Sequence, residues 1–335
     1  MRDAQPRSIR LADYRPPMYL VPRTALHFEL YESFTLVHAT LQLVRNPAGE
    51  QRGPLRLDGE GLELRELLID GQAPAPESWR CDEQGLELDN PPEAFELSTT
   101  VRIDPRANTA LEGLYLSRGM FCTQCEAEGF RRISYFPDRP DVMSVFTVTI
   151  DAELARYPVL LSNGNRTAHA ELVDGRHRVV WEDPFPKPSY LFALVAGHLA
   201  CVEDSFRTCG GRDVTLRLFV EDKDVAKCDH AMQSLKRSMR WDEERYGREY
   251  DLDVFNIVAV DDFNMGAMEN KSLNIFNTSC VLACPATTTD AGFQRVEAIV
   301  AHEYFHNWTG NRVTCRDWFQ LSLKEGFTVF RDAQF

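Results

Sequence analysis

The sequence predicts an α+β protein, with a β-rich first part and a second part in which strands alternate with helices. Residues 1–198 contain short stretches with apolar side chains at every second position, the period of a half-buried strand. From about residue 199 a 3.6-residue period appears beside the strands, as in amphipathic helices. A chain of 335 residues can form two domains, which we place at 1–198 and 199–335.

The first part is predicted to be a β-sandwich or a saddle-like sheet. Strands are expected at residues 35–45, 85–89 and 95–103, where apolar and β-branched residues alternate with polar ones. Asp70-Gly71 and Asp174-Gly175 separate apolar stretches, and each dipeptide can take the positive φ angles that close a hairpin. Short strands divided by turn residues, without a long helical period, favour this architecture.

A proline-rich segment and four histidines are further features of this part. Residues 184–188 include three prolines, so we expect them to form neither a central strand nor a helix. The four histidines do not show the spacing of metal ligands, and we interpret them as ordinary strand residues: His27, His38, His169 and His177.

The second part begins with a strand at 214–220 and a helix from Val225 to Tyr246. Along that helix Met232, Leu235 and Met239 mark one apolar face, and its methionines are expected in the core rather than at a cofactor. The segments that follow are predicted to be a buried strand at 254–260, a strand at 273–276 and a helix from about Ala291.

The last helix carries a pattern of metal-ligating residues. His302 and His306 lie four residues apart, so both imidazoles project from one helix face, with Cβ atoms about 5–6 Å apart. Glu303 lies on the same turn, where it can take a proton from a zinc-bound water as the general base. A catalytic zinc needs a third ligand, and we assign Glu325, which eighteen intervening residues separate from His306. Ser322 and Glu325 also fit a helix-capping box, which is compatible with a ligand in the first turn.

Composition limits the partners and the location. The 37 basic and 51 acidic residues give a net charge of -14, which argues against a nucleic-acid partner. No apolar run is long enough to cross a membrane, and residues 1–7 lack the apolar segment of a signal peptide. Nine cysteines, an odd number, favour reduced thiols, and Cys122 and Cys125 lack a second pair at zinc spacing. We therefore expect a cytoplasmic protein, and a monomer.

Several motifs resemble one family. Residues 264–270 read Asn-Met-Gly-Ala-Met-Glu-Asn, and they precede the His-Glu-x-x-His motif and its distant glutamate. Together with residues 123–132, 190–197 and 306–314, they resemble the gluzincin zinc aminopeptidases. The resemblance implies a thermolysin-like catalytic domain of which only the first half is present, so the chain is expected to be an N-terminal fragment. It implies one zinc ion per chain, and an oxyanion-stabilising tyrosine beyond residue 335.

The resemblance also implies how a peptide is bound. Glu126 and Glu269 are expected to hold the free amine at the N-terminus of the substrate, although by composition alone Glu126 belongs to a solvated charge pattern. Gly266 and Ala267 are small enough for a peptide to pair with the main chain, unless the glycine serves only a tight turn. The remaining residues expected to contact substrate are Met265, which would line the pocket for the first side chain, and Gln124, Met268 and Asn270. The implied activity is release of N-terminal alanine, basic or large apolar residues from peptides.

Overall fold

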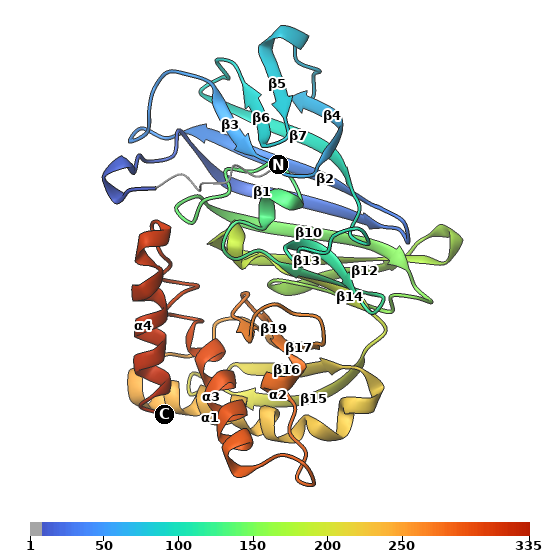
Figure 1. Cartoon of the computed structure of the whole chain (residues 1–335), viewed down its shortest axis with the longest axis vertical. Coiled ribbons are helices and arrows are strands. Elements are labelled where there is room, and N and C mark those ends of the chain that lie inside the picture. The colour runs from blue at the N-terminus through green and yellow to red at the C-terminus, as the bar shows by residue number, and fades with distance from the viewer. Residues whose placement is uncertain (1–8) are drawn as a thin grey trace.

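The computed structural model describes residues 9–335, so the expectation about a signal peptide at residues 1–7 lies outside the described residues. Figure 1 shows a strand-rich N-terminal half above a mixed C-terminal half. The strands of the N-terminal half are β1 (Tyr19–Leu30), β2 (Thr35–Arg45), β3 (Leu55–Asp58), β4 (Glu63–Ile69), β5 (Trp79–Asp82), β6 (Gly85–Leu88), β7 (Ala94–Ile103), β8 (Gly113–Ser117), β9 (Met120–Gln124), β10 (Met143–Glu153), β11 (Val159–Ser162), β12 (Asn165–Glu171), β13 (Arg176–Pro188) and β14 (Leu194–Gly197). One short 3-10 turn precedes the strands, η1 (Leu11–Asp13), and four lie between them: η2 (Pro76–Ser78), η3 (Phe130–Arg132), η4 (Val173–Gly175) and η5 (Ser189–Leu191).

These strands form three sheets around a common core. The largest has the order β12-β13-β10-β1-β2-β7-β4, in which β1 and β10 are parallel and the other neighbours antiparallel. A four-stranded sheet, β11-β14-β9-β8, and a three-stranded sheet, β3-β6-β5, share its hydrophobic core. The β-rich first part is therefore confirmed. Along β2 and β7 every second side chain is buried through most of the strand, which is the alternation that the sequence predicts.

The two expected hairpin turns differ in outcome. Asp174 and Gly175 have positive φ angles and join β12 to β13, which pair as an antiparallel hairpin, so this prediction is confirmed. Asp70 and Gly71 also have positive φ angles, but the turn only brings Ile69 opposite Gln72. The hairpin predicted there is wrong, because the next strand, β5, joins a different sheet.

Residues 184–188 form the end of β13, a strand that the sequence did not predict there, but only β10 pairs with this end, so it is not a central strand or a helix. Pairing with β12 ends at Glu182, so the three prolines face an open edge on that side and need donate no hydrogen bond there. On the other side β13 pairs with β10 through a register shift between Ser144 and Phe146.

The C-terminal half is built on one five-stranded sheet. Its elements are β15 (Ala200–Arg207), β16 (Asp213–Val220), η6 (Asp222–Lys227), α1 (Asp229–Tyr246), β17 (Val254–Val260), β18 (Ala267–Met268), β19 (Leu273–Asn277), α2 (Thr278–Val281), α3 (Asp290–Phe305), η7 (Trp318–Gln320) and α4 (Leu321–Asp332). The sheet order is β15-β16-β17-β19-β18, with β16, β17 and β19 parallel and β18 antiparallel at one edge. The expected α+β class is confirmed. Since β14 belongs to the N-terminal sheets and β15 to this one, we keep the proposed boundary near residue 198.

Both faces of this sheet are covered. Val258 and Val260 of β17 belong to the core shared with the N-terminal half, whereas Ile257 and Ala259 pack in the core formed with α1 and α3. All seven residues of β17 are consequently buried, as in parallel sheets covered on both faces. Because one face is packed on the N-terminal sheets, the segment after β18 lies close to that half.

The helices differ slightly from the predicted ones. The helix predicted from Val225 begins at Asp229, since the preceding residues form the 3-10 turn η6. The helix α3 begins at Asp290, where the Thr289 side chain accepts a hydrogen bond from the Gly292 amide. The helix α4 begins at Leu321, so Ser322 lies inside it and is not its N-cap, which rules out the capping box. Figure 1 shows α4 at the side of the molecule, extending upward beyond α1 and α3.

Two findings concern the predicted location. Within residues 9–335, no helix is both long and apolar enough to cross a membrane. All nine cysteines are free thiols, and burial raises the pKa of Cys122 to about 12, so its thiol is a poor nucleophile at neutral pH.

Candidate metal centre and substrate-binding site

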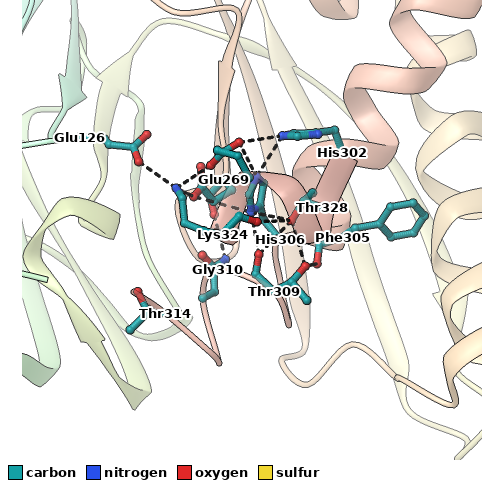
Figure 2. Close-up of polar contacts among 12 residues, drawn as sticks. Glu126, Glu269, His302, Phe305, His306, Thr309, Gly310, Thr314, Lys324 and Thr328 are labelled. Atoms are coloured by element: carbon teal, nitrogen blue, oxygen red, sulfur yellow. Dashed lines mark hydrogen bonds and ion pairs between the residues drawn. The ribbon is translucent and has the colours of Figure 1, made fainter. Parts of the chain in front are cut away.

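Three side chains that the sequence predicts as zinc ligands converge in the structure. His302 on α3 and His306 directly after it place their Nε2 atoms 3.0 Å apart, as Figure 2 shows. Glu325 on α4 places Oε2 3.3 Å from Nε2 of His302 and 3.5 Å from Nε2 of His306. His306 is buried, but 39% of the Glu325 side chain is exposed, so the centre is open on one side.

The other ring nitrogens fix the orientation of both imidazoles. Nδ1 of His302 lies 2.6 Å from Oδ2 of Asp332, and Nδ1 of His306 lies 2.8 Å from the carbonyl oxygen of Thr309. A carboxylate and a carbonyl oxygen only accept hydrogen bonds, so each Nδ1 carries a proton and donates it. Each Nε2 therefore faces the other and Glu325, and a cation bound between them would stabilise this arrangement.

The spacing of the three atoms fits zinc. Tetrahedral ligands at zinc bond lengths of about 2.0–2.2 Å lie about 3.3–3.6 Å from one another, and the observed separations are 3.0, 3.3 and 3.5 Å. The surroundings also favour positive charge. Burial opposes protonation of His302, but the carboxylates of Glu325, Glu303 and Asp332 outweigh it and raise its pKa to about 9. Two imidazoles and one carboxylate with an open side are the donor set of a catalytic zinc site.

Glu303 lies beside this centre without being part of the donor triangle. Its carboxylate is buried, and one of its oxygens, one oxygen of Glu269 and a nitrogen of His306 lie within 4.8 Å of one another. Burial raises the pKa of Glu303 to about 7, although the nearby His306 acts in the opposite direction. A carboxylate with a pKa near 7 can both accept and release a proton at neutral pH, which a general base requires.

Glu126 and Glu269 are brought together from the two halves, and Lys324 lies between them. Nζ of Lys324 lies 2.8 Å from Oε1 of Glu126 and also donates to Glu269, as Figure 2 shows. Burial of Glu269 opposes its ionisation, but the positive charges of Lys324 and His306 outweigh burial and lower its pKa. The pKa of Glu126 is raised, first by burial and then by the negative charge of Glu269. A lysine next to a candidate metal ligand is more often a surface or ion-pair residue than a catalyst. The ion pair is present, but the lysine is buried.

The segment before Glu269 presents an open strand edge. Ala267 and Met268 form β18, the edge strand of the five-stranded sheet, and Met265 just before it is 43% exposed. Gly266 has no positive φ angle, and a Cβ there would meet only the Cys280 sulfur at an ordinary 3.7 Å, so a tight turn does not explain this glycine. Met268 lies in the hydrophobic core, where its side chain cannot contact a substrate.

Two expected substrate residues are buried polar side chains. Both polar side-chain atoms of Gln124, at the end of β9, are buried without a hydrogen-bond partner in the described part of the chain. Asn270 donates to the carbonyl oxygen of Phe192 at 3.3 Å, and its own side-chain oxygen is also without a partner there. Unpaired buried amides are costly, but both side chains are only 1% exposed, as Met268 is, so a ligand would reach them only after the surrounding residues move.

Comparisons with known proteins agree over nearly the whole chain. The Peptidase M1 N-terminal domain matches residues 80–191, and the Peptidase family M1 domain matches residues 230–335. The chain is 57% identical over 332 residues to aminopeptidase N of Caulobacter vibrioides, and 55% identical over 331 residues to aminopeptidase N of Escherichia coli. Each alignment covers 99% of this chain. The chain belongs to peptidase family M1.

A solved aminopeptidase structure has the same fold. Aminopeptidase A of Legionella pneumophila, in complex with aspartic acid, superposes with a TM-score of 0.94 and 39% identity over 97% of this chain. The M1 chain described here spans 38% of the length of that protein and of both aminopeptidase N relatives. The predicted resemblance to the zinc aminopeptidases is confirmed at the level of the family.

Three residues of the candidate site were not found from the sequence. Asp332 and Thr309 orient the two histidines, and Gly310 leaves room for one of them. At Gly310 φ is +149°, and a Cβ would lie 2.6 Å from Nδ1 of His306. The seven residues from Glu325 to Asp332 amount to two helical turns, so the sequence does contain the signal that both carboxylates lie on one face of α4.

Proposed function

We propose that this chain carries the metal centre and the amine-binding site of a zinc-dependent aminopeptidase. The observation that carries the proposal is the convergence of one ring nitrogen each of His302 and His306 with one carboxylate oxygen of Glu325. One zinc ion would be held by these three residues. When bound, zinc would polarise a peptide carbonyl and lower the pKa of a water molecule, the chemistry that such sites supply.

Glu303 is the proposed general base. Its carboxylate would take a proton from the attacking water and then pass it to the leaving nitrogen, which needs a pKa near neutrality. The pKa of about 7 and the buried position beside His306 support this role. No covalent intermediate between the enzyme and the peptide is required.

Glu126 and Glu269 are the proposed partners of the substrate amine. A substrate ammonium group would join Lys324 between the two carboxylates, and each charge-assisted contact contributes about 1.5–3 kcal/mol. The two carboxylates come from opposite halves of the molecule. By holding the substrate amine between them, they would leave room for only one residue between the amine site and the reacting bond. Cleavage would then be restricted to the first peptide bond.

The open edge of β18 is the proposed docking strand for the peptide. An extended substrate could pair with the main chain at Gly266 and Ala267, while the exposed thioether of Met265 adapts to different first side chains. Gln124 and Asn270 would supply further polar contacts. This arrangement suits the broad preference for alanine, basic and large apolar residues that the family resemblance implies.

The dependence on a free amine gives a direct test. We expect alanine p-nitroanilide to be cleaved and its N-acetyl derivative to be cleaved at least 100-fold more slowly, since acetylation removes the charge that Glu126 and Glu269 recognise. Equal rates on both compounds would exclude an aminopeptidase and favour an endopeptidase. Measuring Glu269→Gln with free dipeptides gives a second check, because its KM should rise if the carboxylate binds the amine.

A second function is favoured by the share of the relatives that the chain covers. The chain spans 38% of the aminopeptidase N relatives, so by itself it could bind zinc and peptides without completing catalysis. Binding of zinc and of a bestatin-like amino-acid hydroxyl compound, with no amide turnover, would select this alternative. Turnover by the chain itself would exclude it.

We also propose a cytoplasmic monomer that acts on peptides and has no membrane or nucleic-acid partner. The net charge of -14 and nine cysteines without a disulfide support this proposal.

A further inference from the structure

His27, Glu29 and His38 form a second cluster of metal-type side chains, on the largest sheet of the N-terminal half. His27 on β1 lies directly opposite His38 on the antiparallel strand β2, and Glu29 follows on the same face of β1. One donor atom of each residue lies within 4.8 Å of the others. The histidine side chains are 31% and 37% exposed, so an ion in solution can reach them.

The hydrogen bonds of His38 orient it as a ligand. Oγ1 of Thr100 lies 3.4 Å from Oε2 of Glu66, to which it donates, and 3.0 Å from Nδ1 of His38. A hydroxyl that donates to Glu66 accepts from His38, so the imidazole carries its proton on Nδ1. In this tautomer Nε2 of His38 faces Oε1 of Glu29 at 2.9 Å, and a metal ion bound by both atoms would take the place of a proton in this contact. Metal-ligating histidines are typically held in this way through their second nitrogen.

The neighbouring carboxylates have different roles. The hydroxyl of Tyr31 donates to Oε2 of Glu29 at 2.5 Å, which leaves Oε1 free toward the histidines. Nε2 of His27 lies 2.9 Å from Oδ2 of Asp151, but Arg178 already binds both oxygens of this aspartate at 2.7 and 2.6 Å. Asp151 is therefore neutralised by a cation of its own and also binds Nε2 of His27, so a metal ion would take Oε1 of Glu29, Nε2 of His38 and the ring nitrogen of His27 that Asp151 does not hold.

We infer that His27, Glu29 and His38 bind one divalent transition-metal ion, such as Zn²⁺ or Cu²⁺. Two imidazoles and a carboxylate suit these ions, whereas Mg²⁺ and Ca²⁺ require mainly oxygen ligands. The three donor atoms lie within 4.8 Å of one another, and the closest pair is 2.9 Å apart. The donors of a tetrahedral zinc ion lie about 3.3–3.6 Å apart, and partly exposed side chains can make the small movement that this requires. The ion joins β1 to β2 and stabilises the folded N-terminal half, and the inference is independent of the proposed function.

Counting bound zinc in three proteins tests the inference. The unmodified chain, the double variant His27→Gln/His38→Gln and the control His169→Gln/His198→Gln are freed of metal, loaded with Zn²⁺ and dialysed. Both control histidines are exposed and lie outside the cluster. We expect the double variant His27→Gln/His38→Gln to hold one equivalent of zinc less than the other two proteins. This difference does not depend on how much zinc the centre at His302 retains. Equal zinc in all three proteins would overturn the inference.

A milder variant covers the case in which the double variant does not fold. Thr100→Val keeps all three ligands but removes the hydrogen bond that orients His38, so the affinity for Zn²⁺ at this site should fall about tenfold. Calorimetric titration measures it, and electron paramagnetic resonance of the Cu²⁺ form should show coupling to two imidazole nitrogens. Unchanged affinity in Thr100→Val, or a Cu²⁺ spectrum without nitrogen coupling from this site, would contradict the inference.

Discussion

The Nδ1 atoms of His302 and His306 decide what the candidate centre can bind. Each donates its proton to an oxygen of the protein, Asp332 in one case and the Thr309 carbonyl in the other. The remaining ring nitrogens converge with a carboxylate, so under the proposed function single residues outside the His-Glu-x-x-His motif would control the affinity for the metal.

Replacement of Glu303 by glutamine separates metal binding from catalysis. Glu303→Gln should retain zinc, because the residue is outside the donor triangle, and should lower kcat for alanine p-nitroanilide about 100- to 10,000-fold through loss of the general base. Glu297→Gln is a matched control on the same helix. Oε1 of Glu297 pairs with Nε of Arg237 at 2.7 Å, away from the centre. Retention of most activity in Glu303→Gln would remove this residue from the proposed role.

Replacement of Asp332 by asparagine tests the orientation of His302. An amide at this position still accepts a hydrogen bond but lacks the negative charge, so zinc affinity in Asp332→Asn should fall about 10- to 100-fold. Titration against a fluorescent chelator measures the affinity. Asp222→Asn, in η6, changes the same group away from the centre and should leave the affinity unaltered. The same affinity in both variants would contradict the assignment.

At the scale of elements, the turn after α3 has to fold back so that its carbonyl groups face His306. Thr309 supplies the carbonyl, and Gly310 permits the close approach because it has no side chain. The same turn carries Asn311, which donates to the carbonyl of Glu269 at 2.9 Å. This link connects the metal centre to the amine site.

Two glycine substitutions in adjacent elements should have opposite effects. In Gly310→Ala the new Cβ would lie 2.6 Å from Nδ1 of His306, so we expect a lower melting temperature and weaker zinc binding. Gly326 lies within α4 with no atom near its Cβ position, so Gly326→Ala should stabilise the helix by about 0.5–1 kcal/mol. Calorimetry of both variants tests the pair. A Gly310→Ala variant as stable as Gly326→Ala would refute the close-approach argument.

At the scale of the whole molecule, Lys324 connects three parts of the fold. It is carried by α4 and pairs with Glu126 from the N-terminal half and with Glu269 beside the five-stranded sheet. All three charges are shielded from solvent. Loss of the lysine would leave two carboxylates buried together without a counter-charge.

Lys324→Met should therefore lower the free energy of unfolding by about 3–5 kcal/mol, the usual cost of removing one partner from a buried ion pair. Lys223 forms ion pairs too, but its side chain is 52% exposed, so Lys223→Met should change stability by about 1 kcal/mol or less. Urea denaturation of both variants measures the difference. Similar midpoints for the two would show that the buried network contributes little.

The apolar face of α4 is a further property of the whole molecule. Its side chains Leu323, Phe327, Val329 and Phe330 are 52–60% exposed. Exposed apolar groups of this size usually mark a surface that binds another apolar surface.

The sequence was informative where the signal is local. Alternation predicted β2 and β7, and the four-residue spacing of His302 and His306 predicted their common face. It failed where the outcome depends on distant parts of the chain. The prolines of β13 are tolerated because β12 ends before them, and Lys324 is buried because Glu126 and Glu269 arrive from elsewhere. His27 and His38 meet through strand register, which their spacing of eleven residues does not reveal.

The central claim is that His302, His306 and Glu325 hold a zinc ion, and anomalous X-ray diffraction at the zinc edge tests it most directly. Crystals of the zinc-loaded chain should show an anomalous peak about 2.0–2.2 Å from both Nε2 atoms and from the Glu325 carboxylate. The peak should be lost or strongly weakened in Glu325→Ala. A zinc-loaded crystal without a peak between these three side chains, or a peak unchanged in Glu325→Ala, would contradict the account.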